Sequence, residues 1–424
     1  MIWLLLIVFL VCLLLRFPIA FSLGISCMIY LLFKGIPLVV MPMKMYSGID
    51  VFVLLSIPGF IMAGNLMNQG GLTEKIITFC NHLVGHVRGG LALANIGASM
   101  LFAGISGTAI SDTASIGSVM IPAMKKEGYD ADFSCAVTAS SSTVGPIIPP
   151  SVPMIIAATL SGLSVGKLFL AGALPGLLLG FSLMGLTYVI SRKRNYPKHE
   201  KSSLKEIVSS FFDTFWALLM TFIILYGIIG GVFTPTEASI ITVIYAFMIG
   251  SFVYKKLNIK NTLVLVLDSM KTSASLMVLI GFANLFGWIL ITEQLPQWVS
   301  GEIIQFSQNK YVVLLLINLL LIFIGTFMET IAALLILFPI LLKVAIAVDV
   351  EPIHFAVIAL LNLMIGLTTP PLGICLFVSA GIGKVSIGKV SRAGFPFLLV
   401  SLAVLALVTL FPELSLFLPE LFAD

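Results

Sequence analysis

The chain carries the same pattern twice, about half its length apart, and this duplication constrains the fold more than any other feature. Each copy has an acidic residue ten positions before a proline, followed by a Gly-x-x-x-Pro-Pro segment. The first copy is Asp112, Pro122 and residues 145–150, and the second is Glu329, Pro339 and residues 366–371. Helix-breaking residues and acids at matching places of two apolar halves are typical of broken membrane helices around a midplane site. The pattern therefore predicts two related halves and favours a secondary transporter.

The composition places the chain in a membrane. Hydrophobic residues make up 59% of the 424 positions and charged residues only 10%, with a mean hydropathy of +1.14. A soluble protein cannot cover its surface with so few polar groups. The stretches 168–190 and 211–230 are continuously apolar, whereas a β-barrel would show short alternating segments. The sequence therefore predicts an all-α polytopic membrane protein.

Basic residues give the orientation. They cluster at 192–205 and 255–260, and such clusters are typical of cytoplasmic loops. Counting spans from these clusters predicts a first re-entrant hairpin that opens to the cytoplasm and a second that opens to the exterior. The halves are then inverted repeats. The expected parts are N-terminal scaffold helices (1–50), a first repeat (51–190, hairpin about 91–122, broken helix 133–161), a cytoplasmic loop with central scaffold helices (191–273), and a second repeat with a C-terminal helix (274–424, hairpin about 311–346, broken helix 354–381).

Two moderately polar, basic stretches lie ahead of the repeats, at 73–89 and 258–273. Their composition suits amphipathic helices in the plane of the membrane interface. Residues 274–292 are expected to cross outward, which would place 293–309 on the exterior.

The helix breaks suggest ion sites. A break in hydrocarbon exposes backbone N–H and C=O groups at several kcal/mol per unsatisfied group, unless protein, water or an ion satisfies them. Carbonyl and hydroxyl oxygens there suit Na⁺, and each hairpin tip is expected to face the break of its own repeat. Site 1 would use Ser106, Ser142, Thr143 and Gly145, and site 2 Gly325, Thr326, Met328, Gly366 and Thr369. The alternative is that Gly and Pro only kink the helices for packing.

The acids and nearby hydroxyls have two interpretations. Asp112 and Glu329 each precede a half-helix, where an acid either caps the free N–H groups or serves a ligand. The Ser106, Thr108 and Ser111 hydroxyls are better contacts for an anionic substrate than a carboxylate is. Glu237 follows Pro235, which by itself indicates an ordinary helix start.

An enzyme is the remaining alternative. Residues 104–107 read Gly-Ile-Ser-Gly, as around the nucleophile of rhomboid-type intramembrane serine proteases. A serine nucleophile needs a base within hydrogen-bond reach, and the apolar spans contain no histidine. No enzyme activity is expected.

Together these segments resemble the DctM-like large membrane subunit of the tripartite ATP-independent periplasmic (TRAP) transporters. The resemblance is carried in order by residues 58–64, 104–112, 145–151, 231–239 and 366–373. It implies an elevator-type carrier of the bacterial inner membrane, with a scaffold part and a transport part. By motif position it implies Ser106, Thr108, Asp112 and Glu237 as substrate-site residues.

The resemblance also implies coupling to Na⁺ and two partners. These are a small four-helix membrane subunit, expected as a separate chain, and a periplasmic binding protein that delivers an organic acid. C4-dicarboxylates, sialic acid and other sugar acids are the implied substrates. A self-sufficient anion carrier of related fold, driven by Na⁺ or H⁺, is the alternative.

Overall fold

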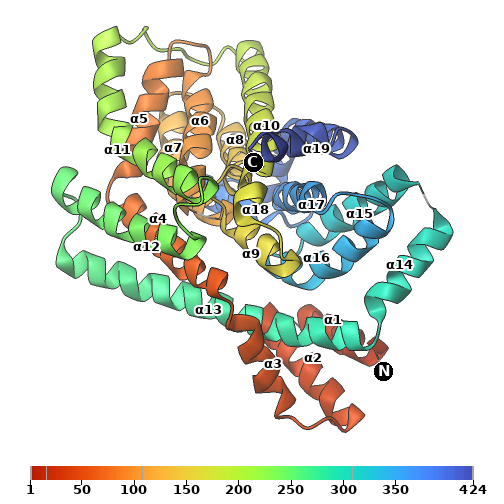
Figure 1. The fold of residues 1–424 in the computed structure, drawn as a ribbon. Coiled ribbons are helices and arrows are strands. Elements are labelled where there is room, and N and C mark those ends of the chain that lie inside the picture. The colour runs from red at the N-terminus through yellow and green to blue at the C-terminus, as the bar shows by residue number, and fades with distance from the viewer. Residues whose placement is uncertain (1, 16, 107, 308, 423–424) are drawn as a thin grey trace.

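The computed structural model describes residues 2–15, 17–106, 108–307 and 309–422, without the side chains at 103–106, 300 and 303–306. In this part of the chain every regular element is a helix (Figure 1). The elements are α1 Ile2–Leu14, α2 Ile19–Lys34, α3 Val40–Ile49, η1 Phe52–Leu55, α4 Ser56–Gln69, α5 Leu72–Val84, α6 Gly90–Ser106, α7 Ala109–Lys126, α8 Ala131–Ser142, η2 Gly145–Ile147, α9 Val152–Ser161, α10 Val165–Lys193, α11 Leu204–Ile229, α12 Pro235–Met248, η3 Ile249–Val253, α13 Ile259–Thr292, α14 Leu295–Phe306, α15 Lys310–Gly325, α16 Thr330–Ala347, α17 Pro352–Gly366, α18 Ile374–Gly383, α19 Ile387–Leu410 and α20 Glu413–Leu421.

The predicted all-α polytopic architecture is confirmed. Seven of the described helices are long and apolar enough to cross a membrane, and α8–η2 with α9 forms an eighth, broken span bent by 43°. Many of their large apolar side chains are exposed, for example Phe181 at 62% and Phe222 at 61%. Exposed aromatics on such helices are suited to lipid, which does not penalise them.

Two helical hairpins lie in the stretches where the sequence predicts re-entrant hairpins. Helices α6 and α7 are the first hairpin, and α15 and α16 are the second. In each hairpin the returning helix contains the proline of the repeated pattern, Pro122 in α7 and Pro339 in α16. The equivalence of the two copies in sequence is therefore an equivalence in structure.

Both broken helices also form. In the first half the chain passes from α8 through η2 to α9, and in the second from α17 to α18. The Pro149–Pro150 and Pro370–Pro371 peptide bonds are both cis. The long helix α10 lies against the first break, and a methyl group on its Gly172 would come within 2.7 Å of the Ile147 carbonyl oxygen. Only a glycine permits this approach, which covers the broken backbone with protein.

The two hairpins open to opposite ends of the molecule. Lys125, at the base of the first, donates from Nζ to the Gly383 carbonyl at the end of α18, at 2.9 Å. Lys310, at the base of the second, lines a cavity with Glu351 and His354 at the start of α17. Because α17 continues into α18 across one break, these are opposite ends of the same crossing. The repeats are therefore inverted.

A polar cluster closes the end that the basic residues assign to the cytoplasm. Asp130, just before α8, accepts hydrogen bonds from Tyr196 at 2.6 Å and Arg194 at 2.7 Å. The Tyr196 hydroxyl and the Arg194 guanidinium lower the pKa of the Asp130 carboxyl. The loop after α10 is thereby attached to the start of the first broken helix.

The predicted interface helix at 258–273 is wrong. Residues 258–273 belong to α13, which runs unbroken over 34 residues, and residues 295–306 form α14. The lysines at 260 and 271 suggested a surface helix. However, Leu263, Leu267 and Met270 are more than half exposed, as expected of a face that meets lipid. At 1.5 Å per residue α13 is about 51 Å long, so it must tilt to stay within the bilayer.

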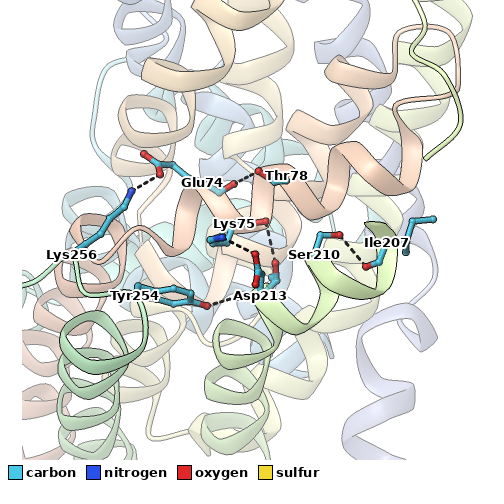
Figure 2. A network of polar contacts seen from close by, with 9 residues as sticks. Glu74, Lys75, Thr78, Ile207, Ser210, Asp213, Tyr254 and Lys256 are labelled. Atoms are coloured by element: carbon cyan, nitrogen blue, oxygen red, sulfur yellow. Dashed lines mark hydrogen bonds and ion pairs between the residues drawn. The ribbon is translucent and has the colours of Figure 1, made fainter. Parts of the chain in front are cut away.

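The prediction of a helix at 73–89 is close, because α5 covers residues 72–84. Ion pairs join it to neighbouring segments, Lys75 to Asp213 of α11 at 2.7 Å and Glu74 to Lys256 at 2.5 Å (Figure 2). Thr214 also donates to the Lys75 carbonyl at 3.1 Å. Exposed ion pairs contribute only about 0–1 kcal/mol each. Together with the Thr214 hydrogen bond, they hold α5 against α11 and against the segment that follows η3.

Candidate functional site

The first turns of three half-helices, α7, α16 and α18, lie in one region of the molecule. Asp112 of the first hairpin and Glu329 of the second both lie within electrostatic range of the Cys375 sulfur at the start of α18. The acids of the two repeats, 217 positions apart in sequence, thus share one region. Helix N-termini carry partial positive charge, and the region also holds two carboxyl groups. Such a setting suits a substrate anion together with cations.

The first hairpin departs from the predicted capping pattern. Thr108 is the N-cap of α7, and its hydroxyl accepts the Ser111 N–H at 3.3 Å. Asp112 lies in the first turn beyond this cap and is fully buried. The interpretation of Asp112 as the N-terminal cap is therefore wrong. The reason is the longer tip, because eight positions separate Gly104 from Asp112 but only four separate Gly325 from Glu329.

The second hairpin follows the prediction for its acid. Glu329 is the N-cap of α16, and its Oε2 accepts the N–H groups of Ile331 at 2.9 Å and Ala332 at 3.3 Å. The capping role predicted for this acid is confirmed. The two acids of the repeated pattern therefore have different local environments.

The tip of the second hairpin packs backbone to backbone against the second break. A methyl group on Gly366 would lie 2.6 Å from the Cα of Gly325. Thr326 follows Gly325 directly, and Thr369 lies one turn after Gly366. Among the residues predicted for the second ion site, Gly325, Thr326, Gly366 and Thr369 are thereby brought together. Met328 lies in the same tip, between Thr326 and the Glu329 cap.

The residues predicted for the first ion site surround the first break. Ser142, Thr143 and Gly145 are all buried at the end of α8 and the start of η2. Helix α6, which leads to the tip of the first hairpin, packs against η2. The Ser106 side chain, predicted both for this ion site and for substrate, lies outside the described residues.

Glu237 lies at a helix start on the surface of the described chain. It forms a reciprocal capping box with Thr234, whose N–H and hydroxyl each donate to Glu237 Oε2 at 2.8 Å. The next-door Thr236 hydroxyl donates to the Phe52 carbonyl at 2.9 Å. These bonds agree with the helix-start interpretation of this segment. Its role toward substrate stays a prediction from the resemblance.

Sequence reasoning missed the polar pairs that join each hairpin to its broken helix. Ser99 of α6 donates to Ser141 of α8 at 2.9 Å. In the other repeat Asn362 of α17 donates to Asn318 of α15 at 2.8 Å. A polar residue in an apolar span needs a partner, so the two asparagines in otherwise apolar runs were the available signal. Each pair holds the hairpin against the break.

Comparison with known proteins extends these observations. The family model for the tripartite ATP-independent periplasmic transporter DctM component matches residues 6–414. The sialic acid TRAP transporter large permease protein SiaM of Vibrio cholerae is 44% identical over 379 residues, 89% of each chain. The C4-dicarboxylate TRAP transporter large permease protein DctM of Pseudomonas aeruginosa is 39% identical over 400 residues, 94% of each chain.

The fold is also similar to that of a solved transporter. The YdaH transporter of Alcanivorax borkumensis superposes with a TM-score of 0.62 at 16% identity, over 87% of this chain and 86% of that one. At this identity the likeness concerns the fold alone. The relatives are permeases, so the chain is a transporter component and not an enzyme. With its duplicated hairpins, broken helices and a family match over nearly its whole length, the chain belongs to the large permease family of TRAP transporters, multi-pass proteins of the inner membrane that serve organic acids.

Proposed function

We propose that the chain is the large permease of a Na⁺-driven importer for an organic acid, which a periplasmic binding protein delivers. The observation that carries the proposal is the close approach of Gly325 to Gly366. It places the end of one broken segment beside the end of another, so that carbonyl oxygens from the last turns of both helices lie close together. In transporters of this kind unwound carbonyls coordinate Na⁺.

The oxygens around the second break suit Na⁺. The Thr326 hydroxyl donates to the Phe323 carbonyl at 2.7 Å, and the Thr369 hydroxyl to the Ile365 carbonyl at 2.9 Å. A hydroxyl that donates its proton to the preceding turn keeps lone pairs for a cation. With the carbonyl of Gly325 and that of Gly366 nearby, these groups would form one oxygen shell. The carbonyl at Met328 is a further candidate ligand.

The first break offers a related set of oxygens. The Ser142 hydroxyl donates to the Thr138 carbonyl at 2.8 Å, and the Thr143 hydroxyl to the Ser140 carbonyl at 2.7 Å. Their lone pairs are likewise left for a cation, next to the broken backbone at Gly145. Two related sites, one in each repeat, predict more than one Na⁺ per transported substrate.

The substrate is an organic acid in this proposal, because the relatives are named for sialic acid and for C4-dicarboxylates. Both classes carry carboxylate groups. Thr108 and Ser111 at the start of α7 would present their hydroxyls to a carboxylate, together with backbone N–H groups of that helix start. Ser106, Asp112 and Glu237 complete the candidate substrate residues. In the second hairpin the equivalent helix start is that of α16, at Thr330.

The ion sites make a direct prediction. In proteoliposomes, uptake should require an inward Na⁺ gradient and rise with external Na⁺ with a Hill coefficient above about 1, as expected for more than one coupled site. Replacing Na⁺ by choline should abolish uptake. Thr326→Ala should shift the half-saturating Na⁺ concentration upward by about 5- to 30-fold, the loss of one hydrogen bond or ligand of roughly 1–2 kcal/mol. Full uptake in choline with a proton gradient would contradict Na⁺ coupling.

The proposal also predicts dependence on partners. Nearly all of the described residues lie in helices that pack together (Figure 1), and the proposal assigns the capture of dilute substrate to a separate protein. Uptake by the chain alone should be at least about tenfold slower than with a small membrane subunit and a binding protein, a difference of about 1.4 kcal/mol. Uptake at the full rate without partners would favour the self-sufficient carrier.

An elevator movement of the hairpins against α11–α13 is the mechanism that the proposal assigns to this fold.

A further inference from the structure

A cavity of about 430 Å³ separates two groups of helices, α3 and α13 on one side and α9 and α16 on the other. Figure 1 shows α9 and α16 above α13, and α3 on the lower side of α13. Helix α9 follows the first break, and α16 is the returning helix of the second hairpin. The cavity therefore lies between the hairpin assembly and the framework. The polar side chains that line it are Lys44, Ser47, Thr159, Asn284 and Trp288.

The cavity lies toward the exterior end of these helices. Trp288 is in the last turns of α13, which ends at Thr292, and Thr159 is in the last turn of α9. Both helix ends are exterior by the distribution of basic residues. A molecule arriving from outside would reach this cavity before it reached the hairpin tips.

Lys44 is the cation of this cavity. Its Nζ lies 5.1 Å from the centroid of the Trp288 ring, a distance at which the ring face attracts a cation. The Asn284 side chain donates to the Lys44 carbonyl at 2.7 Å, which fixes α3 against α13 at this point. The close contact of Gly48 with Asn284 has the same effect, because a methyl group on Gly48 would come within 2.3 Å of the asparagine Cβ. These two contacts hold the backbone of α3 against α13, and this keeps the Lys44 ammonium group at the cavity.

The charge of Lys44 is available to an anion. Lys34, at the same exterior side, forms an ion pair with Glu293 at 2.7 Å. Within the described residues no carboxylate lies at ion-pair distance from Lys44, and none of the residues lining the cavity is acidic. A single positive charge in a partly enclosed, mostly apolar cavity raises the local concentration of anions.

We propose that this cavity is the exterior vestibule for the organic acid and that Lys44 binds a substrate carboxylate there on its way to the hairpins. This inference rests on the proposed function. The volume is within the range of small-molecule sites, about 300–1,000 Å³. The walls of the cavity come from both helix groups. A bound molecule would therefore contact the hairpin assembly (α9 and α16), which moves in the proposed mechanism, and the framework (α3 and α13), which stays fixed. An anionic lipid headgroup offers the same charge, and the experiment below separates it from the substrate.

The first test is uptake by the complex of permease, small subunit and binding protein in liposomes. Lys44→Gln should raise the KM for substrate about 5- to 20-fold and change kcat less than about twofold, because only the approach of the anion is weakened. The KM of this variant should also depend less on salt than that of the wild type. Lys44→Arg should keep KM near the wild-type value. Lys310→Gln is the matched control, since Lys310 also lies 5.1 Å from an aromatic ring, that of Tyr311, away from this cavity.

The second test is binding without transport. Titration of the purified permease with sialic acid, and separately with succinate, should change tryptophan emission saturably for the acid that is the substrate. Lys44→Gln and Trp288→Phe should each remove this change. The assay needs no Na⁺ gradient, so it tests the vestibule even where uptake proves independent of Na⁺ and the proposed function fails.

Three results would overturn the vestibule. One is a KM for Lys44→Gln that equals the KM for Lys310→Gln. Another is a fluorescence titration that neither variant alters, or that neither acid produces. The third is a Lys44→Gln effect that appears only in phosphatidylglycerol liposomes and vanishes in phosphatidylcholine, which would assign the cavity to a lipid headgroup.

Discussion

Replacing Gly366 with alanine should abolish uptake. The added methyl group would lie 2.6 Å from the Cα and 2.7 Å from the carbonyl carbon of Gly325. Both contacts are with backbone, so no side chain can rotate away. Overpacking of this kind costs about 1–3 kcal/mol and moves the backbone. Here it would separate the second hairpin tip from the second break, where the proposed Na⁺ site lies, and we expect uptake below about 5% of wild type, equivalent to about 2 kcal/mol.

The control is Gly381→Ala in α18, where a methyl group would have nothing within 4 Å. Both changes remove one glycine from the same broken crossing, and both raise helix propensity. Only Gly366→Ala should impair Na⁺-driven uptake, measured at saturating substrate with protein amounts matched by western blot. Uptake by Gly366→Ala within twofold of Gly381→Ala would show that the contact with Gly325 is not needed for transport.

The fold was largely predictable because the sequence features that determine it act locally and occur in both halves of the chain. A proline, a paired Pro-Pro and a capping residue each act on the backbone within a few positions, so the hairpins and broken helices could be placed within a few residues. The α13 helix shows the limit of this reasoning. Its first half carries Asp268 and Lys271 among apolar residues, and sequence alone did not distinguish a surface helix from one that faces lipid. Only the continuous packing of α13 against α2, α3 and α4 resolves the choice.

The candidate site was less predictable, because it depends on contacts between the repeats. The equal spacing of Asp112 and Glu329 to their prolines suggested equal roles. The four extra residues in the first tip shift the cap of α7 back to Thr108 and leave Asp112 inside the helix. The position of Cys375 near both acids depends on how α18 packs against α7, which spacing does not encode. Patterns predicted which residues matter, and tertiary packing decided their roles.

This difference in roles leads to the second large effect. Asp112 lies one turn beyond the cap of α7 and is fully buried, in the region shared with Glu329. A carboxyl group buried at membrane depth costs stability, so its presence there favours a functional role. A negative charge in this region would attract Na⁺ to the oxygens around the helix breaks. We expect Asp112→Asn to lower uptake at least about 20-fold, or about 1.8 kcal/mol, with a melting temperature equal to or above that of the wild type.

The matched variants are at the two caps. Thr108→Ala removes the hydroxyl that accepts the Ser111 N–H, and Glu329→Ala removes two such acceptor contacts. Loss of a cap costs about 0.5–2 kcal/mol, so both variants should melt at lower temperature, whereas Thr108→Ser keeps the cap and should melt near wild type. Thermal melting and uptake measured together therefore separate capping from ligand binding. If Asp112→Asn melts at a lower temperature than wild type, and its uptake falls only in proportion to the folded fraction, then the role of Asp112 is structural. Wild-type uptake by that variant would remove Asp112 from the site, because a neutral amide there would serve the ions and the substrate as well as the carboxylate does.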